Sequence, residues 1–187
     1  MNLSRILPVA IPVGRFWVRS QRRRHRSGDR ARPLTDCENA LLSPFFDSEL
    51  LRKVRVAEVS AFPCPWFYSL VRHLAVNVPE MSHASAITFD DTIVVVRDPA
   101  RIIHDWYPLL FHELVHVVQY DILGLDLFID RYLRAFAAAG MDYDQNAFER
   151  EAYALQRRFQ FAPAAPFSVK AAVLGGNRRS SHNRVRE

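Results

Sequence analysis

The residues with the clearest chemical potential are His112, Glu113 and His116, which form the pattern His-Glu-x-x-His. In a helix, residues four positions apart lie one above the other on the same face. His112 and His116 can therefore direct a ring nitrogen toward one metal ion, and zinc is the ion that such a pair typically binds. Glu113 lies about 100° further round the helix. Its carboxylate is then free to accept a proton from a metal-bound water.

The residues around this pattern favour a metal site over a chance match. From 109 to 118, every residue other than the two histidines and Glu113 is apolar. A helix that is apolar on all sides is buried, and buried imidazoles and carboxylates are costly unless they are paired or coordinated. The alternative is that His112 and His116 are core residues bonded to carbonyl groups, with Glu113 paired to an arginine. That alternative has to explain three buried polar groups at a catalytic spacing, so we favour the metal site.

A catalytic zinc takes three protein ligands, so a third ligand is needed. No further histidine follows at the short spacing that completes a three-histidine site, and the candidates are Glu149 and Glu151. They flank the apolar stripe of a predicted helix on opposite sides, so periodicity cannot choose between them. The small Ala152 beside them allows this helix to approach the motif helix closely. The alternative is that Glu149 only forms a capping box with Asn146.

Three consecutive helices are predicted to carry these residues. The motif helix begins near Asp105 and Pro108 and ends at Gly124, the second spans 125–139, and the third begins after Asn146. The third helix has one apolar stripe at helical spacing, formed by Phe148, Ala152, Leu155 and Phe159.

Strands are predicted before the motif helix. The alternation of apolar and polar residues over 54–59 predicts a half-buried strand. Two β-rich runs, 86–89 and 92–96, are separated by Asp90 and Asp91 and predict a β-hairpin. The 92–96 strand is either a sheet edge that binds an extended peptide or, given its three consecutive valines, an ordinary buried strand. The predicted fold class is α+β, with a small antiparallel sheet or hairpin packed on the motif helix and two further helices.

Arginine is concentrated at the two ends of the chain. Residues 1–32 contain nine arginines and one acidic residue, and 175–187 contain four arginines and one glutamate. The formal charge of the whole chain is +5, whereas 33–174 carry about −6. We therefore predict a disordered basic arm over 1–32, one domain over 33–170, and a disordered basic tail from 171 to 187. These arms can contact nucleic acid non-specifically through charge, and nothing favours a specific nucleic-acid site.

The sequence also bears on the location of the protein. It has no uninterrupted apolar run of 18 residues, so no membrane span is expected. Cys37 and Cys64 are too few for a disulfide framework and are interpreted as reduced, packed thiols. The apolar stretch near the N-terminus is followed by an arginine block instead of a cleavage site. A cytoplasmic location is favoured over secretion, and the oligomeric state is not indicated.

Two motifs together resemble those of a known family. The stretch HELVHVVQY over 112–120 and the stretch FEREAYA over 148–154 resemble the gluzincins, zinc peptidases with His-Glu-x-x-His on one helix and a glutamate ligand on a later one. The second motif is similar to the Glu-x-x-Ala-Asp element of the CAAX prenyl protease family. The first is similar to short bacterial HExxH domains in which the motif continues as His-Val-x-Gln.

This resemblance implies a zincin-like metallopeptidase domain that requires zinc (Zn2+). Carried over residue by residue, it makes His112, His116 and Glu149 the zinc ligands and Glu113 the catalytic base. The implied activity is hydrolysis of peptide bonds in a peptide or protein substrate. The alternative is a zinc-stabilised binding or scaffold domain with little or no catalytic turnover.

The chain departs from the prenyl protease pattern at one supporting position. Tyr153 stands where that pattern has an aspartate that supports a ligand histidine, and Asp144 or Tyr153 itself is the candidate replacement. A group that stabilises the oxyanion is also required for hydrolysis. The sequence offers four unranked candidates for it: Tyr120, Tyr143, Tyr153 and His104.

Overall fold

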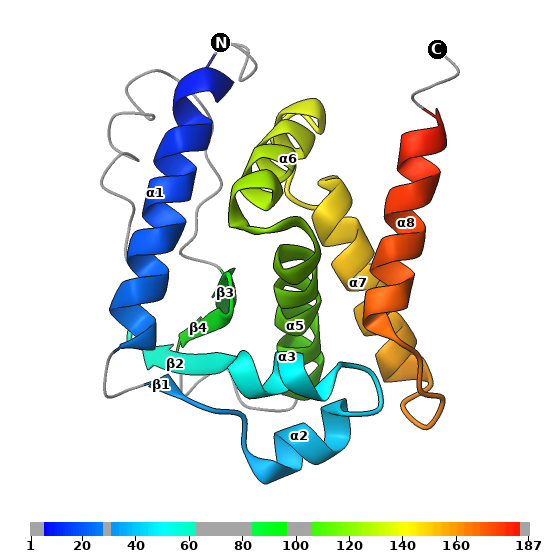
Figure 1. Ribbon diagram of the computed structural model, residues 1–187. Helices are drawn as coiled ribbons and strands as arrows, with labels where there is room; N and C mark the ends of the chain where they lie inside the picture. The colour runs from blue at the N-terminus through cyan, green and yellow to red at the C-terminus, as the bar shows by residue number, and fades with distance from the viewer. Residues whose placement is uncertain (1–5, 28–30, 63–83, 97–105, 184–187) are drawn as a thin grey trace.

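The computed structural model describes residues 6–27, 31–62, 84–96 and 106–183, with side chains described up to 176 (Figure 1). The predicted helix start at Asp105, the oxyanion candidate His104 and the thiol of Cys64 lie outside these residues. The elements are, in chain order, α1 (Leu7–Arg26), β1 (Ala31–Arg32), α2 (Asp36–Leu42), α3 (Ser48–Lys53), β2 (Arg55–Val59), β3 (Ala86–Phe89), β4 (Thr92–Val96), α5 (Trp106–Leu123), α6 (Leu125–Ala138), α7 (Ala147–Phe161) and α8 (Val169–Asn183).

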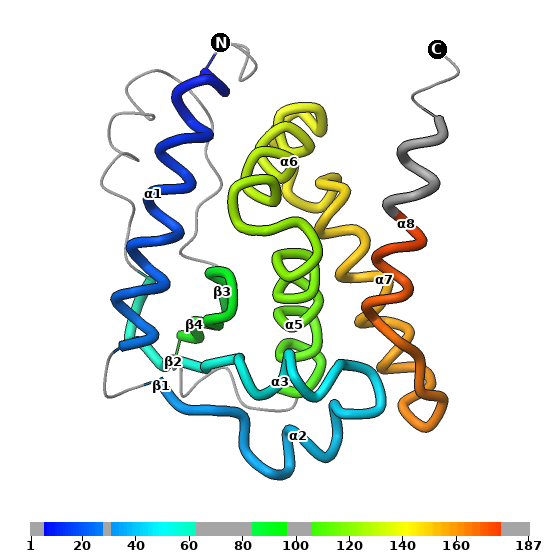
Figure 2. The backbone as a smooth tube through the Cα atoms, in the orientation of Figure 1, coloured from blue at the N-terminus to red at the C-terminus, as the bar shows by residue number. Residues whose placement is uncertain are grey.

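The architecture is mixed α+β and is built around α5, as predicted. Figure 1 shows α5 between the sheet on one side and α7 and α8 on the other, with α1 along the far side of the sheet. The apolar composition of α5 explains its central place, because all its residues from Leu110 to Tyr120 are buried. Figure 2 shows the chain turning from α5 into α6 and returning along α5 as α7. The turn is made at Gly124, the predicted end of the motif helix, with a φ of 73° that glycine adopts easily.

The sheet confirms the predicted hairpin and corrects the predicted topology. Its strand order is β1-β2-β4-β3, and β3 and β4 pair antiparallel across a turn at Asp90 and Asp91. The pairing of β2 with β4 is parallel, so the sheet is mixed instead of antiparallel. Of the two alternatives for 92–96, the structure shows the buried strand and not the sheet edge, because β4 lies between β2 and β3. Its buried Ile93 and Val94 fit an internal strand, and β3 forms the edge within the described sheet.

The predicted disordered arm over residues 1–32 is wrong, since most of it forms α1. This helix packs on α6 and on the sheet. Two of its arginines bind the acidic hairpin turn: Arg22 donates to Asp91 at 2.7 and 2.8 Å, and Arg26 forms an ion pair with Asp91 at 2.9 Å. Apolar residues on one face are buried, namely Leu7, Ile11 and Val18. The prediction missed α1 because the high arginine content of this segment outweighed its short apolar stripe, and because the acidic partners of the arginines lie elsewhere in the sequence.

The predicted disordered tail from residue 171 is also wrong for its helical part. Helix α8 continues to Asn183, and its first turns are anchored by Val169 and Val173, which are buried in the same core as α5. Among the described residues, the fold therefore contains four helices beyond the three expected, namely α1, α2, α3 and α8. The packed-thiol interpretation fails for Cys37, which is exposed and free.

Glu38 connects α2 to the first residue of α5. This buried carboxylate accepts two hydrogen bonds from Arg32 at 2.8 and 2.9 Å and one from the indole of Trp106 at 3.0 Å. It also completes a capping box with Thr35, whose backbone N–H donates to it at 2.7 Å. Burial by itself raises the pKa of Glu38, but the bonds from Arg32 and Thr35 outweigh it and lower the pKa to about 2.

This lowered pKa predicts how stability depends on pH. The carboxylate stabilises the fold above its ordinary pKa of 4.5, and the contribution is lost as the pH falls toward 2. We expect Glu38→Gln to lower the free energy of unfolding at pH 7 by about 2 kcal/mol, allowing for the partial exposure of Arg32. Urea unfolding of both proteins should show this difference at pH 7 and its decrease between pH 5 and pH 2. A constant difference over that range would contradict the assignment.

Candidate metal centre

Three side chains from α5 and α7 converge on one point inside the protein. The Nε2 atoms of His112 and His116 lie 3.1 Å apart, and Oε2 of Glu149 lies 3.2 Å from the first and 3.3 Å from the second. All three residues are buried. Among the described residues, they form a group whose ligand atoms lie close enough together to hold one metal ion. The helix spacing places the two histidines on one face of α5, and the close packing of α7 on α5 brings Glu149 to them.

These separations fit a tetrahedral ion. Ligand atoms bound to tetrahedral zinc at about 2.0–2.1 Å lie about 3.3 Å from one another. The observed separations of 3.1, 3.2 and 3.3 Å agree with that arrangement. Two imidazoles and one carboxylate are also the ligand set of a catalytic zinc site with one open position. The residues present therefore fit zinc in both geometry and chemistry.

The orientation of His116 is set by Gln119, one helical turn further along α5. The amide nitrogen of Gln119 donates to the carbonyl of Phe148 at 3.2 Å and to the carboxylate of Glu151 at 2.9 Å. The amide oxygen of Gln119 consequently faces Nδ1 of His116, 2.8 Å away, and can only accept. Nδ1 therefore carries the proton, and Nε2 of the neutral ring presents a lone pair toward Glu149.

His112 has an equivalent support from α7. Its Nδ1 lies 3.1 Å from the amide oxygen of Gln156, so Nδ1 donates and Nε2 presents the lone pair. The ring of Tyr153 packs on the ring of His112 at a centroid distance of 4.5 Å. Two lone pairs and one carboxylate thus face one another, an arrangement that requires a positive charge between them.

The pKa values of His116 and Glu149 are consistent with a positive charge between these groups. Burial alone lowers the pKa of His116, but the facing carboxylate of Glu149 outweighs it and raises the pKa to about 9. Burial tends to raise the pKa of Glu149, and His116 and His112 lower it far below its usual range. The carboxylate is therefore ionised, and a proton occupies the cluster when no metal ion does.

Glu149 is also held from the side opposite the histidines. The hydroxyl of Tyr132 on α6 donates to Oε1 of Glu149 at 2.7 Å, and Tyr143 also helps to lower the pKa of this carboxylate. Burial and the charge of Glu149 raise the pKa of both tyrosines, so both remain protonated donors. The bond from Tyr132 to Oε1 leaves Oε2 of Glu149 directed at the two histidines.

Glu113 lies beside this cluster and outside it. The hydroxyl of Thr88 on β3 donates to Oε2 of Glu113 at 2.6 Å, and the side chain of Glu113 is buried. Its negative charge contributes to the raised pKa of His116. The hairpin thus positions Glu113 with one oxygen fixed by Thr88.

The structure distinguishes Glu149 from Glu151, the two candidate ligands between which helical periodicity could not choose. Glu149 meets the histidines, whereas Glu151 binds Gln119 and supports His116 indirectly. Asn146 does cap α7, because its side chain accepts from the N–H of Phe148 at 3.1 Å. The carboxylate of Glu149 points to the histidines instead of completing a capping box with Asn146.

The remaining candidates, for stabilising an oxyanion or for supporting a histidine, lie in different parts of the structure. Tyr143 and Tyr153 both lie at the site, whereas Tyr120 packs on Phe128 of α6 at a centroid distance of 3.8 Å. Asp144 is exposed and does not bond either histidine among the described contacts. The glutamines therefore provide the hydrogen bonds that an aspartate was expected to provide, and Tyr153 contributes packing.

Four residues of the site were not identified from the sequence. Two could have been found from helical spacing, since Gln119 follows His116 by three positions and Gln156 follows Glu149 by seven. Tyr132 and Thr88 gave no signal, because α6 and β3 meet the site only through the tertiary packing.

Helix α8 approaches this hydrogen-bond network at Gly176. A Cβ atom added there would lie 2.6 Å from Oε1 of Glu151, so that side chain would have to move away from Gln119. We expect Gly176→Ala to weaken zinc binding about fivefold, because the support of His116 is loosened. The measurement is zinc affinity by competition with a chromophoric chelator.

Gly175 provides the matched control for this prediction. Its added Cβ meets no atom within 4 Å, and both substitutions raise helix propensity equally. Gly175→Ala should therefore leave the zinc affinity unchanged. Equal affinities in the two variants would show that Glu151 does not support the site.

Comparisons of the chain with protein-family models, curated proteins and solved structures find no match. The functional interpretation therefore depends on the side-chain geometry and on the motifs themselves.

Proposed function

We propose that this chain is a zinc-dependent peptidase of the gluzincin type with a minimal zincin-like fold. His112, His116 and Glu149 hold the zinc ion, and Glu113 is the catalytic base. The observation that carries the proposal is the convergence of two imidazole nitrogens and one carboxylate oxygen at 3.1 to 3.3 Å. A further buried carboxylate, Glu113, lies beside them and is fixed by a hydrogen bond from Thr88.

Each side chain has a defined task in hydrolysis. Zinc bound here supplies a Lewis acid that polarises the carbonyl group and lowers the pKa of water to about 7. Glu113 accepts the proton of the attacking water and delivers it to the nitrogen of the breaking C–N bond, which leaves as an amine. Tyr132 holds Glu149 in place, and Gln119 holds His116. Of the candidates for stabilising the oxyanion, Tyr143 and Tyr153 are the ones that lie at the site.

The substrate we propose is an extended segment of a peptide or protein. β3 forms the edge of the described sheet, and its Thr88 contacts Glu113. A peptide that adds to this edge by backbone hydrogen bonds passes beside the base. This assignment replaces the 92–96 strand, whose two sides are both paired.

A second candidate is a zinc-stabilised binding or scaffold domain. The observation in its favour is the depth of the cluster, since His112, His116 and Glu149 are only 4%, 6% and 2% exposed. Structural zinc sites are closed and have four protein ligands, whereas three are brought together here among the described residues. A structural site also has no use for the buried carboxylate of Glu113, so we favour the peptidase.

The test combines elemental analysis with a peptidase assay. Protein purified without added metal should contain one zinc per chain and should cleave members of a fluorogenic peptide library. A strong chelator should abolish cleavage, and added zinc should restore it. Full zinc content without cleavage of any peptide would favour the scaffold, and a protein that binds no zinc would exclude both candidates.

A further inference from the structure

Helix α1 has an exposed apolar surface opposite the face that packs on the fold. Val9 and Phe16 are 68% and 64% exposed. Pro12 is also exposed, and the three lie on one side of the helix because their spacing is three and four residues. None of them contributes to the buried side of α1. Large apolar side chains grouped on one helical face are unusual on a surface that contacts only water.

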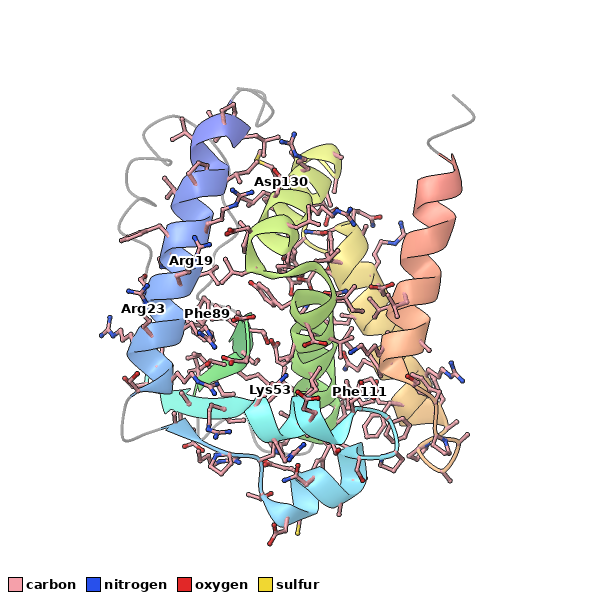
Figure 3. All side chains as sticks on the ribbon, in the orientation of Figure 1. Arg19, Arg23, Lys53, Phe89, Phe111 and Asp130 are labelled. Atoms are coloured by element: carbon pink, nitrogen blue, oxygen red, sulfur yellow. The ribbon has the colours of Figure 1, made fainter. Side chains whose placement is uncertain are left out.

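Two arginines continue this surface toward the C-terminal end of α1. Arg23 and Arg24 are exposed, and neither forms an ion pair with a described residue. In Figure 3, Arg23 lies on the side of α1 that faces away from α5. By contrast, Arg19, Arg22 and Arg26 are paired with acidic residues of α6 and of the hairpin turn. We call the surface formed by Val9, Pro12, Phe16, Arg23 and Arg24 the outer face of α1.

We propose that the outer face of α1 docks on a membrane that contains anionic phospholipids. Phe16 and Arg23 are seven residues apart, or about 10 Å along the helix axis. Seven residues are nearly two full turns, so both side chains face the same way. A helix that lies along a bilayer buries such an apolar face about 5–10 Å into the boundary between headgroups and acyl chains. Val9 and Phe16 enter the acyl region, while Arg23 and Arg24 bind the phosphates.

The order of apolar and basic residues favours a lipid surface over other acidic partners. Nucleic acid would be attracted to the arginines but would gain nothing from Val9 and Phe16. No helix among the described residues has both the length and the apolar character to cross a bilayer. The proposal is independent of the metal centre, since no residue of the outer face contributes to it.

The test measures partition of the full-length chain onto lipid vesicles by co-sedimentation. The chain should bind vesicles of phosphatidylcholine mixed with phosphatidylglycerol and should bind vesicles of pure phosphatidylcholine much more weakly. Phe16→Ser should lower the partition coefficient about tenfold. Arg23→Gln combined with Arg24→Gln should lower it by a similar factor and should remove the preference for anionic lipid.

Matched controls come from elsewhere on the surface. Phe161 is 86% exposed at the end of α7, and Arg52 and Lys53 are neighbouring cations on α3. Phe161→Ser and the double variant Arg52→Gln with Lys53→Gln should both leave binding unchanged. The proposal is overturned if the wild type does not bind anionic vesicles, or if the controls lose as much binding as the outer-face variants. A wild-type dimer that Phe16→Ser dissociates would overturn it in favour of a second copy of the chain.

Discussion

Replacement of His116 by alanine is expected to remove zinc from the protein. His116 supplies one of three ligand atoms, and its removal leaves Glu149 and His112 to hold the ion alone. The affinity should fall at least about a hundredfold, since each ligand of a zinc site contributes several kcal/mol. The amide oxygen of Gln119 also loses its partner. Zinc per chain after dialysis, measured by elemental analysis, should fall from one to near zero.

The control for this prediction is a histidine outside the cluster. His25 on α1 stacks on Phe89 and has no part in the metal centre, so His25→Ala should retain one zinc per chain. Circular dichroism distinguishes loss of a ligand from loss of the fold. Zinc should also raise the melting temperature of the wild type and not that of His116→Ala. Full zinc content in folded His116→Ala would refute the metal centre.

Glu113→Gln is expected to separate metal binding from catalysis. Glutamine has the same shape and can still accept the hydrogen bond from Thr88, but it cannot accept the proton of water. We expect zinc content to be unchanged and the rate of peptide cleavage to fall about a thousandfold, the usual contribution of general acid–base catalysis. The measurement is kcat/KM on the best fluorogenic peptide, with zinc determined on the same sample.

An exposed glutamate on α3 provides the control. The side chain of Glu49 is 71% exposed, and Glu49→Gln should not change kcat/KM. Undiminished cleavage by Glu113→Gln would mean that another group is the base. Zinc-loaded wild type that cleaves no peptide, together with an equally inactive Glu113→Gln, would leave the zinc-stabilised scaffold as the function.

The sequence by itself determined the local elements that carry the site. The apolar run around His112 predicted a buried helix, and Gly124 marked its end. The two β-rich runs separated by Asp90 and Asp91 predicted the hairpin, and the stripe that includes Ala152 predicted α7. These predictions succeeded because helical periodicity, strand propensity and turn residues act over a few neighbouring positions.

The tertiary structure decided which carboxylate meets the histidines. Glu149 and Glu151 lie at similar angles on either side of the apolar stripe of α7, so only the rotation of that helix against α5 distinguishes them. Packing brings Glu149 to His112 and His116 and leaves Glu151 on Gln119. The donors from other elements, such as Tyr132, depend on the same packing.

The basic N-terminal segment is a second case in which the tertiary structure decided what local sequence patterns could not. The excess of arginine over residues 1–32 led to a prediction of disorder. That prediction failed because composition does not reveal which charged side chains will form ion pairs in the fold. The hairpin turn places Asp91 beside Arg22 and Arg26, and these ion pairs together with a narrow buried stripe keep α1 on the fold. Pairings between residues more than 60 positions apart are fixed by the fold as a whole, and local sequence patterns do not encode them.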